Sequence, residues 1–331
     1  MSDIITVKNL VEVYSDGTKA VDDISFNVAE GEFFGFLGPN GAGKSTTIKI
    51  LTTLLRKTSG MVNVAGFDVD KQAAAIRKII GVQSQETTVD GDLTGRENIT
   101  LQGHFHQMKT DEIKKRVNEL LKLVGLEEAA GKRARNYSGG MKKRLDLATA
   151  LIHKPKILFL DEPTTGLDPQ SRSAIWSYLE KINKEEGITI FLTTQYLEEA
   201  DKLCKRLSII DVGKIVASGS PKELKQEIGA DSIRISLENC GKDKERAKEL
   251  IKSLTDVNQI LDSEDCLTVY AKNAGLLIAD IVRALDSSDI RIASVTFSSP
   301  SLDDVFMKHT GKRIRTEELV KAPSRMFGGR R

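Results

Sequence analysis

A glycine-rich run is the part of the sequence best suited to chemistry. Its residues fit the pattern of a phosphate-binding loop: Gly38, Pro39, Asn40, Gly41, Ala42, Gly43, Lys44 and Ser45. Glycines let the backbone bend so that several N–H groups point at one oxyanion, and a following helix presents its positive end to the same phosphates. Lys44 would reach the β- and γ-phosphates of ATP, the Ser45 hydroxyl would ligate Mg²⁺, and Thr46 completes the predicted nucleotide contacts at this loop.

Two adjacent carboxylates form the second candidate for chemistry. Ile157 to Leu160 would be a buried strand, and Asp161 and Glu162 follow at its carboxyl end, where ligands gather in open α/β sheets. Asp161 would hold Mg²⁺, directly or through water, and Glu162 would orient and deprotonate an attacking water. Phosphoryl transfer depends on positioning and charge compensation, so this sparse set of groups suffices for it.

The elements that must position these groups are predicted from hydrophobic periodicity. Residues 3 to 13 and 21 to 29 alternate apolar and polar positions, as half-buried strands do. Glu32 to Leu37 is a compact apolar strand that leads into the loop, and a helical stretch from Thr46 to Leu55 follows it. Further short apolar runs alternate with helices, which indicates a mostly parallel α/β sheet. These later runs are Ile157 to Leu160, Thr189 to Thr193 and Leu207 to Ile210.

The chain divides into two predicted domains and a tail. Residues 1 to 228 would form the first domain, and helical spacing from about 90 to 150 predicts a helical insert within it. Residues 229 to 310 have the order strand, helix, strand, strand, helix, strand, which is typical of a small α+β ferredoxin-like domain. Residues 311 to 331 carry Lys, Arg, Gly and Pro with little apolar content, so we expect a flexible tail there.

The segment Tyr137 to Met141, upstream of the carboxylate strand, reads Tyr-Ser-Gly-Gly-Met. It resembles the signature of the ABC transporter ATPase family, usually Leu-Ser-Gly-Gly-Gln, from which its first and last residues depart. In that family the serine and glycines, here Ser138, Gly139 and Gly140, close over the γ-phosphate bound to the opposite subunit; a helix start binds anions well. The resemblance implies a RecA-like parallel sheet with an antiparallel β part and the helical insert, and an ATP-dependent homodimer.

Other residues match this family in order along the chain. Tyr14 falls where the family places an aromatic that stacks on adenine, although a core or strand-edge tyrosine would give the same pattern. Gln85 lies where the family has a glutamine that contacts Mg²⁺ and senses the membrane partner, and Gln83 is close enough to compete for that register. Asp168 matches the loop that crosses the dimer interface, and it would also cap a helix before Pro169.

Two further positions are interpreted with this resemblance in mind. The family usually has a histidine that contacts the γ-phosphate after the strand at Thr189 to Thr193, where this chain has Gln195. An amide can donate a hydrogen bond to phosphate but cannot carry positive charge, so we predict that Glu162 is the essential base and Gln195 positions phosphate. The daunorubicin-resistance-like branch of ABC exporters is similar in having glutamine there, and Ser299 to Phe306 looks like the end of its accessory domain. The basic run Lys142 to Arg144 is interpreted as a solvated helix face, with a role at the dimer interface as the alternative.

Bulk composition limits the partners and the location. Lys plus Arg is 49 and Asp plus Glu is 47 among 331 residues, and this near-neutral balance argues against a general nucleic-acid binder. No stretch approaches about 18 consecutive apolar residues, and the N-terminus lacks the pattern of a signal peptide. With no spanning segment predicted, the family resemblance implies a peripheral protein at the cytoplasmic face of the cell membrane, held there by a separate transmembrane permease.

The predicted function is an ATP-hydrolysing subunit that powers export of a small or lipophilic compound through that permease. An importer motor is the nearest alternative, and only the resemblance of the accessory domain and Gln195 favours export. A soluble ABC ATPase of translation would resemble two cassettes in one chain, and a DNA-repair ATPase would carry a long coiled coil, whereas this sequence has one cassette and no sustained heptads. A purely regulatory subunit is disfavoured by the intact Lys44, Asp161 and Glu162.

Overall fold

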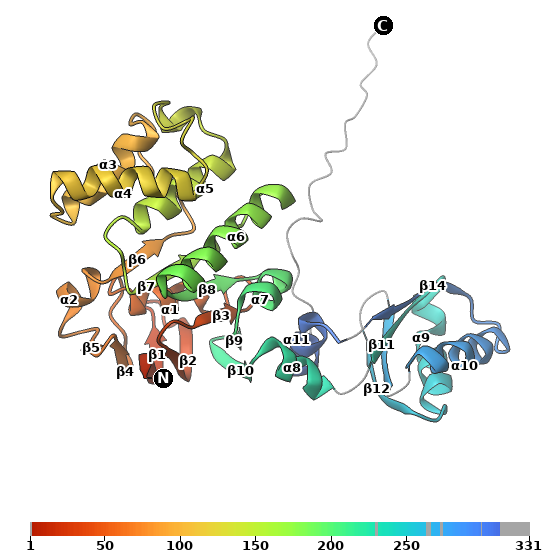
Figure 1. Cartoon of the computed structure of the whole chain (residues 1–331). Coiled ribbons are helices and arrows are strands. Elements are labelled where there is room, and N and C mark those ends of the chain that lie inside the picture. The colour runs from red at the N-terminus through yellow and green to blue at the C-terminus, as the bar shows by residue number, and fades with distance from the viewer. Residues whose placement is uncertain (1, 229–230, 263–265, 272–273, 299, 312–331) are drawn as a thin grey trace, which may run out of the picture.

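The computed structural model places a sheet-and-helix core beside a helical lobe and a smaller antiparallel unit (Figure 1). The predicted tail lies outside the described residues except for Gly311. Among the helices that the structure describes, none combines the length and the apolar character needed to span a membrane. The described residues are 2–228, 231–262, 266–271, 274–298 and 300–311.

The central sheet carries the predicted short buried strands in the order β10-β9-β3-β8-β7-β6. The pairs from β9 through β3, β8 and β7 to β6 are parallel, and β10 returns antiparallel to β9. The prediction of a mostly parallel sheet is therefore confirmed. The strands are β3 (Phe33–Leu37), β6 (Ile80–Gln83), β7 (Ile157–Asp161), β8 (Thr189–Thr194), β9 (Arg206–Asp211) and β10 (Lys214–Gly219).

A second, antiparallel sheet in the order β2-β1-β4-β5 packs with the central one through a shared apolar core. Five phenylalanine rings in this core lie with neighbouring centroids 5.4 to 5.9 Å apart. Aromatic packing of this kind fixes β3, β7 and β8 against each other, and those strands end at the phosphate loop and the carboxylates. The rings are those of Phe26, Phe34, Phe36, Phe159 and Phe191. The strands are β1 (Asp3–Val13), β2 (Lys19–Ala29), β4 (Ser59–Val64) and β5 (Phe67–Asp68).

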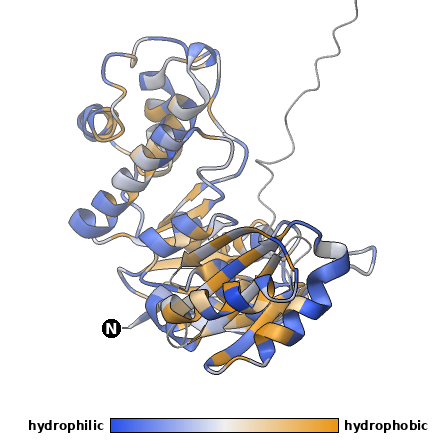
Figure 2. Cartoon of the chain, turned by 90° about the vertical axis from the view of Figure 1, so that its right-hand side faces the viewer, coloured by the Kyte–Doolittle hydropathy of each residue, from blue (hydrophilic) through white to orange (hydrophobic). Residues whose placement is uncertain are grey.

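Helices surround these sheets, and the predicted helical insert forms the separate lobe beyond β6 (Figure 1). Thr94 begins the lobe with a reciprocal cap, in which its hydroxyl accepts from the Glu97 amide and the Glu97 carboxylate accepts from the Thr94 amide. Figure 2 shows hydrophobic residues along the inner strands and hydrophilic residues on outward helix faces. The helices of the core and lobe are α1 (Lys44–Leu51), α2 (Ala73–Arg77), α3 (Gly95–Phe105), α4 (Thr110–Leu123), the 3₁₀ turn η1 (Ala134–Asn136), α5 (Gly139–Ala150), α6 (Pro169–Glu186), α7 (Leu197–Leu203) and α8 (Pro221–Ile228).

The smaller unit has the strand–helix–strand–strand–helix–strand order predicted from the sequence. Its sheet is antiparallel, in the order β12-β13-β11-β14, and it has an apolar core of its own beneath two helices. This is the strand order of a ferredoxin-like fold. Its elements are β11 (Asp231–Leu237), α9 (Cys240–Lys252), β12 (Val257–Asp262), β13 (Cys266–Ala271), α10 (Ala274–Asp286) and β14 (Ile292–Ser298).

A last helix, α11 (Leu302–Thr310), joins this unit to the core. It packs on α8, as Figure 1 shows, and Val305 and Phe306 belong to the same apolar cluster as Leu224 of α8. On its other side, the buried Asp304 accepts a 3.0 Å hydrogen bond from the Tyr270 hydroxyl of β13. Since α11 contacts both parts, the domain boundaries at 228 and 310 stay a prediction.

Candidate functional site

The phosphate loop connects β3 to α1, and two of its glycines are required by space. A Cβ at Gly38 would lie 2.3 Å from the Ile210 carbonyl oxygen, and one at Gly43 would lie 2.4 Å from the Ala20 carbonyl oxygen. Gly43 also has a φ of 106°, which favours glycine. Because Gly43 caps the helix, α1 begins at Lys44, earlier than the predicted start, and its positive end faces the loop. Along the loop, Asn40 and Gly41 are exposed, Pro39 and Ser45 are half-buried, and Gly38, Ala42, Gly43, Lys44 and Thr46 are buried.

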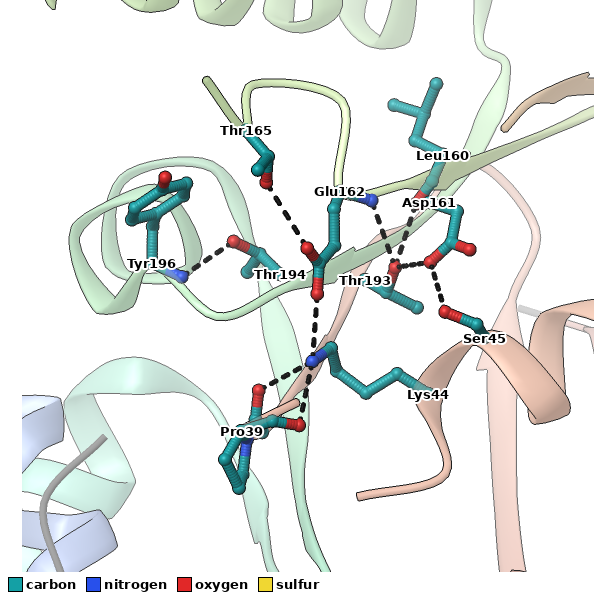
Figure 3. Close-up of polar contacts among 11 residues, drawn as sticks. Pro39, Lys44, Ser45, Leu160, Asp161, Glu162, Thr165, Thr193, Thr194 and Tyr196 are labelled. Atoms are coloured by element: carbon teal, nitrogen blue, oxygen red, sulfur yellow. Dashed lines mark hydrogen bonds and ion pairs between the residues drawn. The ribbon is translucent and has the colours of Figure 1, made fainter. Parts of the chain in front are cut away.

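The Lys44 ammonium bridges the loop and the second candidate motif (Figure 3). Its Nζ donates to the carbonyl oxygens of Gly38 at 2.8 Å and Pro39 at 3.0 Å, and it lies 3.0 Å from Glu162 Oε1. Both charged side chains are buried, at 4% and 5% exposure, so the pair is weakly screened by water. The predicted Lys44 and Glu162 therefore meet.

Oxygen atoms suited to magnesium gather beside this pair. The Ser45 hydroxyl donates to Asp161 Oδ1 at 3.2 Å, and the Thr193 hydroxyl donates to the same oxygen at 2.6 Å (Figure 3). Hydroxyl and carboxylate oxygens are the ligands that Mg²⁺ prefers, so Ser45 and Asp161 fit the predicted metal site. Sequence reasoning missed Thr193, because its place beside Asp161 comes from the register of β7 against β8.

The backbone at Glu162 is strained, and hydrogen bonds hold both its amide and its side chain. Its φ of 49° lies in the left-handed region that non-glycine residues rarely adopt. The Glu162 amide donates to Thr193 Oγ1 at 3.2 Å, and the Thr165 hydroxyl donates to Glu162 Oε2 at 3.3 Å. Gln195 follows β8 directly and is 3% exposed, so it lies at the same edge of the sheet.

Tyr14 follows β1 and lies beside the helix that begins at the loop. Its hydroxyl is 3.0 Å from Thr46 Oγ1, and the residue is 37% exposed. This exposure excludes the alternative of a fully buried core tyrosine. Adenine stacking remains our prediction for this ring.

Replacing Tyr14 with Ala is expected to weaken ATP binding by roughly 5- to 150-fold, because base–aromatic stacking contributes about 1–3 kcal/mol. Tyr14→Phe keeps the ring and loses only the contact with Thr46, so its affinity should stay within about threefold of wild type. Isothermal titration with ATP measures both variants. Equal losses in the two would assign the effect to the hydroxyl and not to stacking.

The signature segment stands at the start of α5. The Ser138 hydroxyl accepts from the Met141 amide at 3.3 Å, which caps the helix, and both Ser138 and Gly139 are exposed. A Cβ at Gly140 would lie 2.7 Å from Ser171 Oγ, so glycine permits close approach of α5 to α6.

Asp168 caps α6 in the way predicted. It accepts from the Ser171 amide at 2.9 Å and from the Ser171 hydroxyl at 2.7 Å, and these hydrogen bonds lower the pKa of its carboxyl. Within the part of the chain that the structure describes, none of the hydrogen bonds of Ser138 or Asp168 reaches the phosphate loop. Both residues are exposed and so are accessible to a second copy of the chain.

The structure also distinguishes Gln83 from Gln85 as candidates for the predicted Mg²⁺ contact. Gln83 is the last residue of β6, is 1% exposed, and donates through Nε2 to the Lys143 carbonyl oxygen at 3.1 Å. Gln85 lies beyond the strand and is exposed, which favours it over Gln83 as the side chain free to reach a ligand.

The interpretation of the basic run as a solvated face is wrong for Lys143, which is 8% exposed and donates through Nζ to the Gln85 carbonyl oxygen.

Comparison with known proteins agrees with this geometry. A family model described as ABC transporter matches residues 21–165, and one described as ATP-binding protein DrrA1-3-like, C-terminal domain, matches residues 219–310. The chain is 41% identical to a daunorubicin resistance ATP-binding protein of Streptomyces coeruleorubidus, over 96% of this chain and 98% of that protein. It is 36% identical to a linearmycin resistance ATP-binding protein of Bacillus subtilis, over 94% of this chain and 100% of that protein.

Solved structures resemble the greater part of the chain. CbiO1 of Clostridium perfringens, part of an ABC transporter complex, superposes with a TM-score of 0.64 at 31% identity, over 77% of this chain and 96% of that one. A dimeric ATP-binding cassette with bound ADP and phosphate superposes with a TM-score of 0.61 at 30% identity, over 65% of this chain and 98% of that one.

Proposed function

Because this chain belongs to the ABC transporter family of ATP-binding, ATP-hydrolysing subunits, we propose that it powers export of a small or lipophilic compound through a separate permease. The meeting of Lys44, Ser45, Asp161 and Glu162 at the carboxyl edge of the sheet carries the catalytic part of the proposal. Export is supported by relatives named for resistance to daunorubicin and linearmycin, which match along nearly the whole chain.

In the proposed site, each group has one task. The loop amides and Lys44 bind the phosphates of ATP, and Ser45, Asp161 and Gln85 would hold Mg²⁺. The metal ion supplies positive charge against the charge that develops on the phosphates. Glu162 accepts the proton of the attacking water, and the Gln195 amide donates to the γ-phosphate.

The second half of the site comes from a second copy in this proposal. Ser138, Gly139 and Gly140 of one copy would cover the γ-phosphate on the loop of the other, and Asp168 would cross the interface between them. The exposure of Ser138, Gly139 and Asp168 supports this arrangement, as does the dimeric cassette among the similar structures. A chain that carries both sets of residues can form a symmetric pair with two identical sites.

A groove between the core and the helical lobe is the surface we assign to the permease, which would hold the chain at the cytoplasmic face of the membrane. It has a volume of about 390 Å³ and is lined by β6, the end of α3 and the end of α5. His106 and His153 form one wall of it, and their rings stack with centroids 3.7 Å apart. Burial lowers the pKa of His153 to about 4, so this wall is neutral at physiological pH. Leu54, at the rim, is 67% exposed. A short amphipathic segment of the permease fits such a partly apolar groove, in which Arg77 is the charged lining residue.

Leu54→Asp is expected to reduce recovery of the permease at least about tenfold, because a charge there would be desolvated on docking. Leu276→Asp is the matched control, since Leu276 is a 78% exposed leucine on α10, away from the groove. Each variant is purified from detergent-solubilised membranes of the native cell, and the proteins bound to it are identified by mass spectrometry. Equal recovery with both variants would remove the groove from the proposal.

The same pull-down with the wild-type chain tests the proposed function itself. Recovery of one polytopic membrane protein supports the transporter subunit, and transport assays on that complex then separate export from import. Recovery of ribosomal or DNA-bound proteins, with the membrane fraction empty, would overturn the transport proposal and leave the ATPase in place.

A further inference from the structure

The helix that carries the signature serine is bonded twice to the segment at residues 83–85. Gln83 donates from its side chain to the Lys143 backbone, and Lys143 donates from its side chain to the Gln85 backbone. This reciprocal pair is buried on both sides, with Gln83 1% and Lys143 8% exposed. Burial lowers the pKa of the Lys143 ammonium, and the charges of Asp146, Asp161 and Glu162 oppose that shift. Because Lys143 is almost inaccessible to water, its ammonium interacts with the Gln85 carbonyl oxygen and with these neighbouring charges.

A second buried side chain on α5 extends the connection. Asp146 is 1% exposed and accepts two hydrogen bonds at Oδ1 from Thr88, from the amide at 3.2 Å and from the hydroxyl at 2.8 Å. Gln83 and Gln85 thus bond to Lys143, and Thr88 bonds to Asp146. Lys143 and Asp146 are three residues apart, so they lie one above the other on that face.

The two ends of this connection lie at different sites. Ser84 and Thr88 line the groove assigned to the permease. Ser138, which caps the same α5, is the residue assigned to the γ-phosphate of the opposite copy. A helix is stiff over this distance, so a displacement of residues 83–88 has to move the start of α5 with it as long as these hydrogen bonds hold.

We propose that Lys143 and Asp146 are positioning residues that clamp α5 to residues 83–88, so that occupation of the permease groove and closure of Ser138 over ATP change together. This inference rests on the proposed function for its two end points, the groove and the signature serine. The clamp itself is independent of both, because its hydrogen bonds lie within one chain.

Amide hydrogen exchange tests the clamp at two reporter positions. The Thr88 amide is bonded to Asp146, and the Met141 amide is bonded to Ser138. Lys143→Met keeps most of the side-chain volume and removes the ammonium, and Lys142→Met on the same helix is the matched control. Without nucleotide, we expect exchange at residues 84–88 to rise about fivefold or more in Lys143→Met, the effect of losing one buried hydrogen bond. The control should match the parent.

The second arm measures coupling, which a merely structural role would not change. With ATP in a Glu162→Gln background, exchange should slow at both reporters together in the parent and the control. In Lys143→Met, exchange should slow only at the Met141 amide and not at the Thr88 amide. Thr88→Val removes one bond at the exposed end of the clamp, and it should show the same loss of coupling if Lys143→Met fails to fold.

Three outcomes are informative: two would overturn the clamp, and one would overturn the proposed closure of Ser138. Identical exchange at residues 84–88 in Lys143→Met and Lys142→Met without nucleotide, or joint slowing of both reporters in Lys143→Met with ATP, would refute the clamp. If ATP protects neither reporter in the parent, the proposed closure of Ser138 over ATP is wrong, and the measurement without nucleotide still decides whether the clamp exists.

Discussion

Glu162→Gln should lower kcat for ATP hydrolysis by about 100-fold or more, the usual contribution of a general base. The amide that replaces the carboxylate cannot accept the proton of water under these conditions. ATP affinity should stay equal or increase, because Lys44 no longer has a carboxylate 3.0 Å away that competes with the phosphates. Phosphate release measures the rate, and size-exclusion chromatography with ATP should show the dimer accumulating.

Glu198→Gln is the matched control, since Glu198 is an exposed carboxylate on α7 near the same edge of the sheet. It should leave kcat and affinity unchanged. Gln195→Ala should lower kcat less than Glu162→Gln does, because it removes one hydrogen bond to phosphate and no base. The reverse result, with turnover abolished in Gln195→Ala and kept in Glu162→Gln, would exchange the roles of the two residues.

The parts of the site that the sequence predicted are those that local pattern determines. Lys44 and Ser45 are placed by a loop whose glycines are required by backbone geometry, and Asp161 and Glu162 end a strand that its apolar residues mark clearly. Parallel strands align their carboxyl ends, so a prediction of the sheet already brings these two segments to one edge. The central sheet, the insert and the ferredoxin-like order were predictable for the same reason.

The parts that were missed depend on contacts between distant segments. Thr193 bonds to Asp161 because of the register of two strands, and no spacing within the sequence encodes that register. Lys143 looked like one of three solvated cations, since nothing local shows that Gln83 and Gln85 will cover it. Glu199 is another such case, because its buried carboxylate accepts from Thr164 and Trp176 on separate elements.

Helix α11 could be predicted from local pattern only in part, because its packing partner is distant in the sequence. Its spacing and its cap are readable, and the sequence resemblance assigned it to the end of the accessory domain. Its amphipathic face shows that one side will be buried but does not show against what. The structure places Leu302, Val305 and Phe306 in the cluster that contains Trp176 of α6, so the face completes the core of the ATPase part.

Phe306→Ala is therefore expected to destabilise the ATPase core by about 3–5 kcal/mol, the usual cost of deleting a buried phenylalanine ring. Phe306 is 1% exposed, whereas Phe297 on β14 is 47% exposed, so Phe297→Ala is the matched control and should cost under about 1 kcal/mol. Trp176 is the only tryptophan of the chain and is buried, so its fluorescence during urea unfolding follows the core.

The urea midpoint of the Trp176 fluorescence in Phe306→Ala decides which part of the chain α11 stabilises. A lower urea midpoint at Trp176 in Phe306→Ala means that the last helix of the chain closes the core of the first domain, and that a truncation at residue 228 would leave an open apolar face on α8. An unchanged midpoint at Trp176, with loss of structure only in the ferredoxin-like unit, would contradict this packing. The hydrogen bond from Lys308 Nζ to the Glu227 carbonyl oxygen, at 2.9 Å, lies at the same contact and favours the first result.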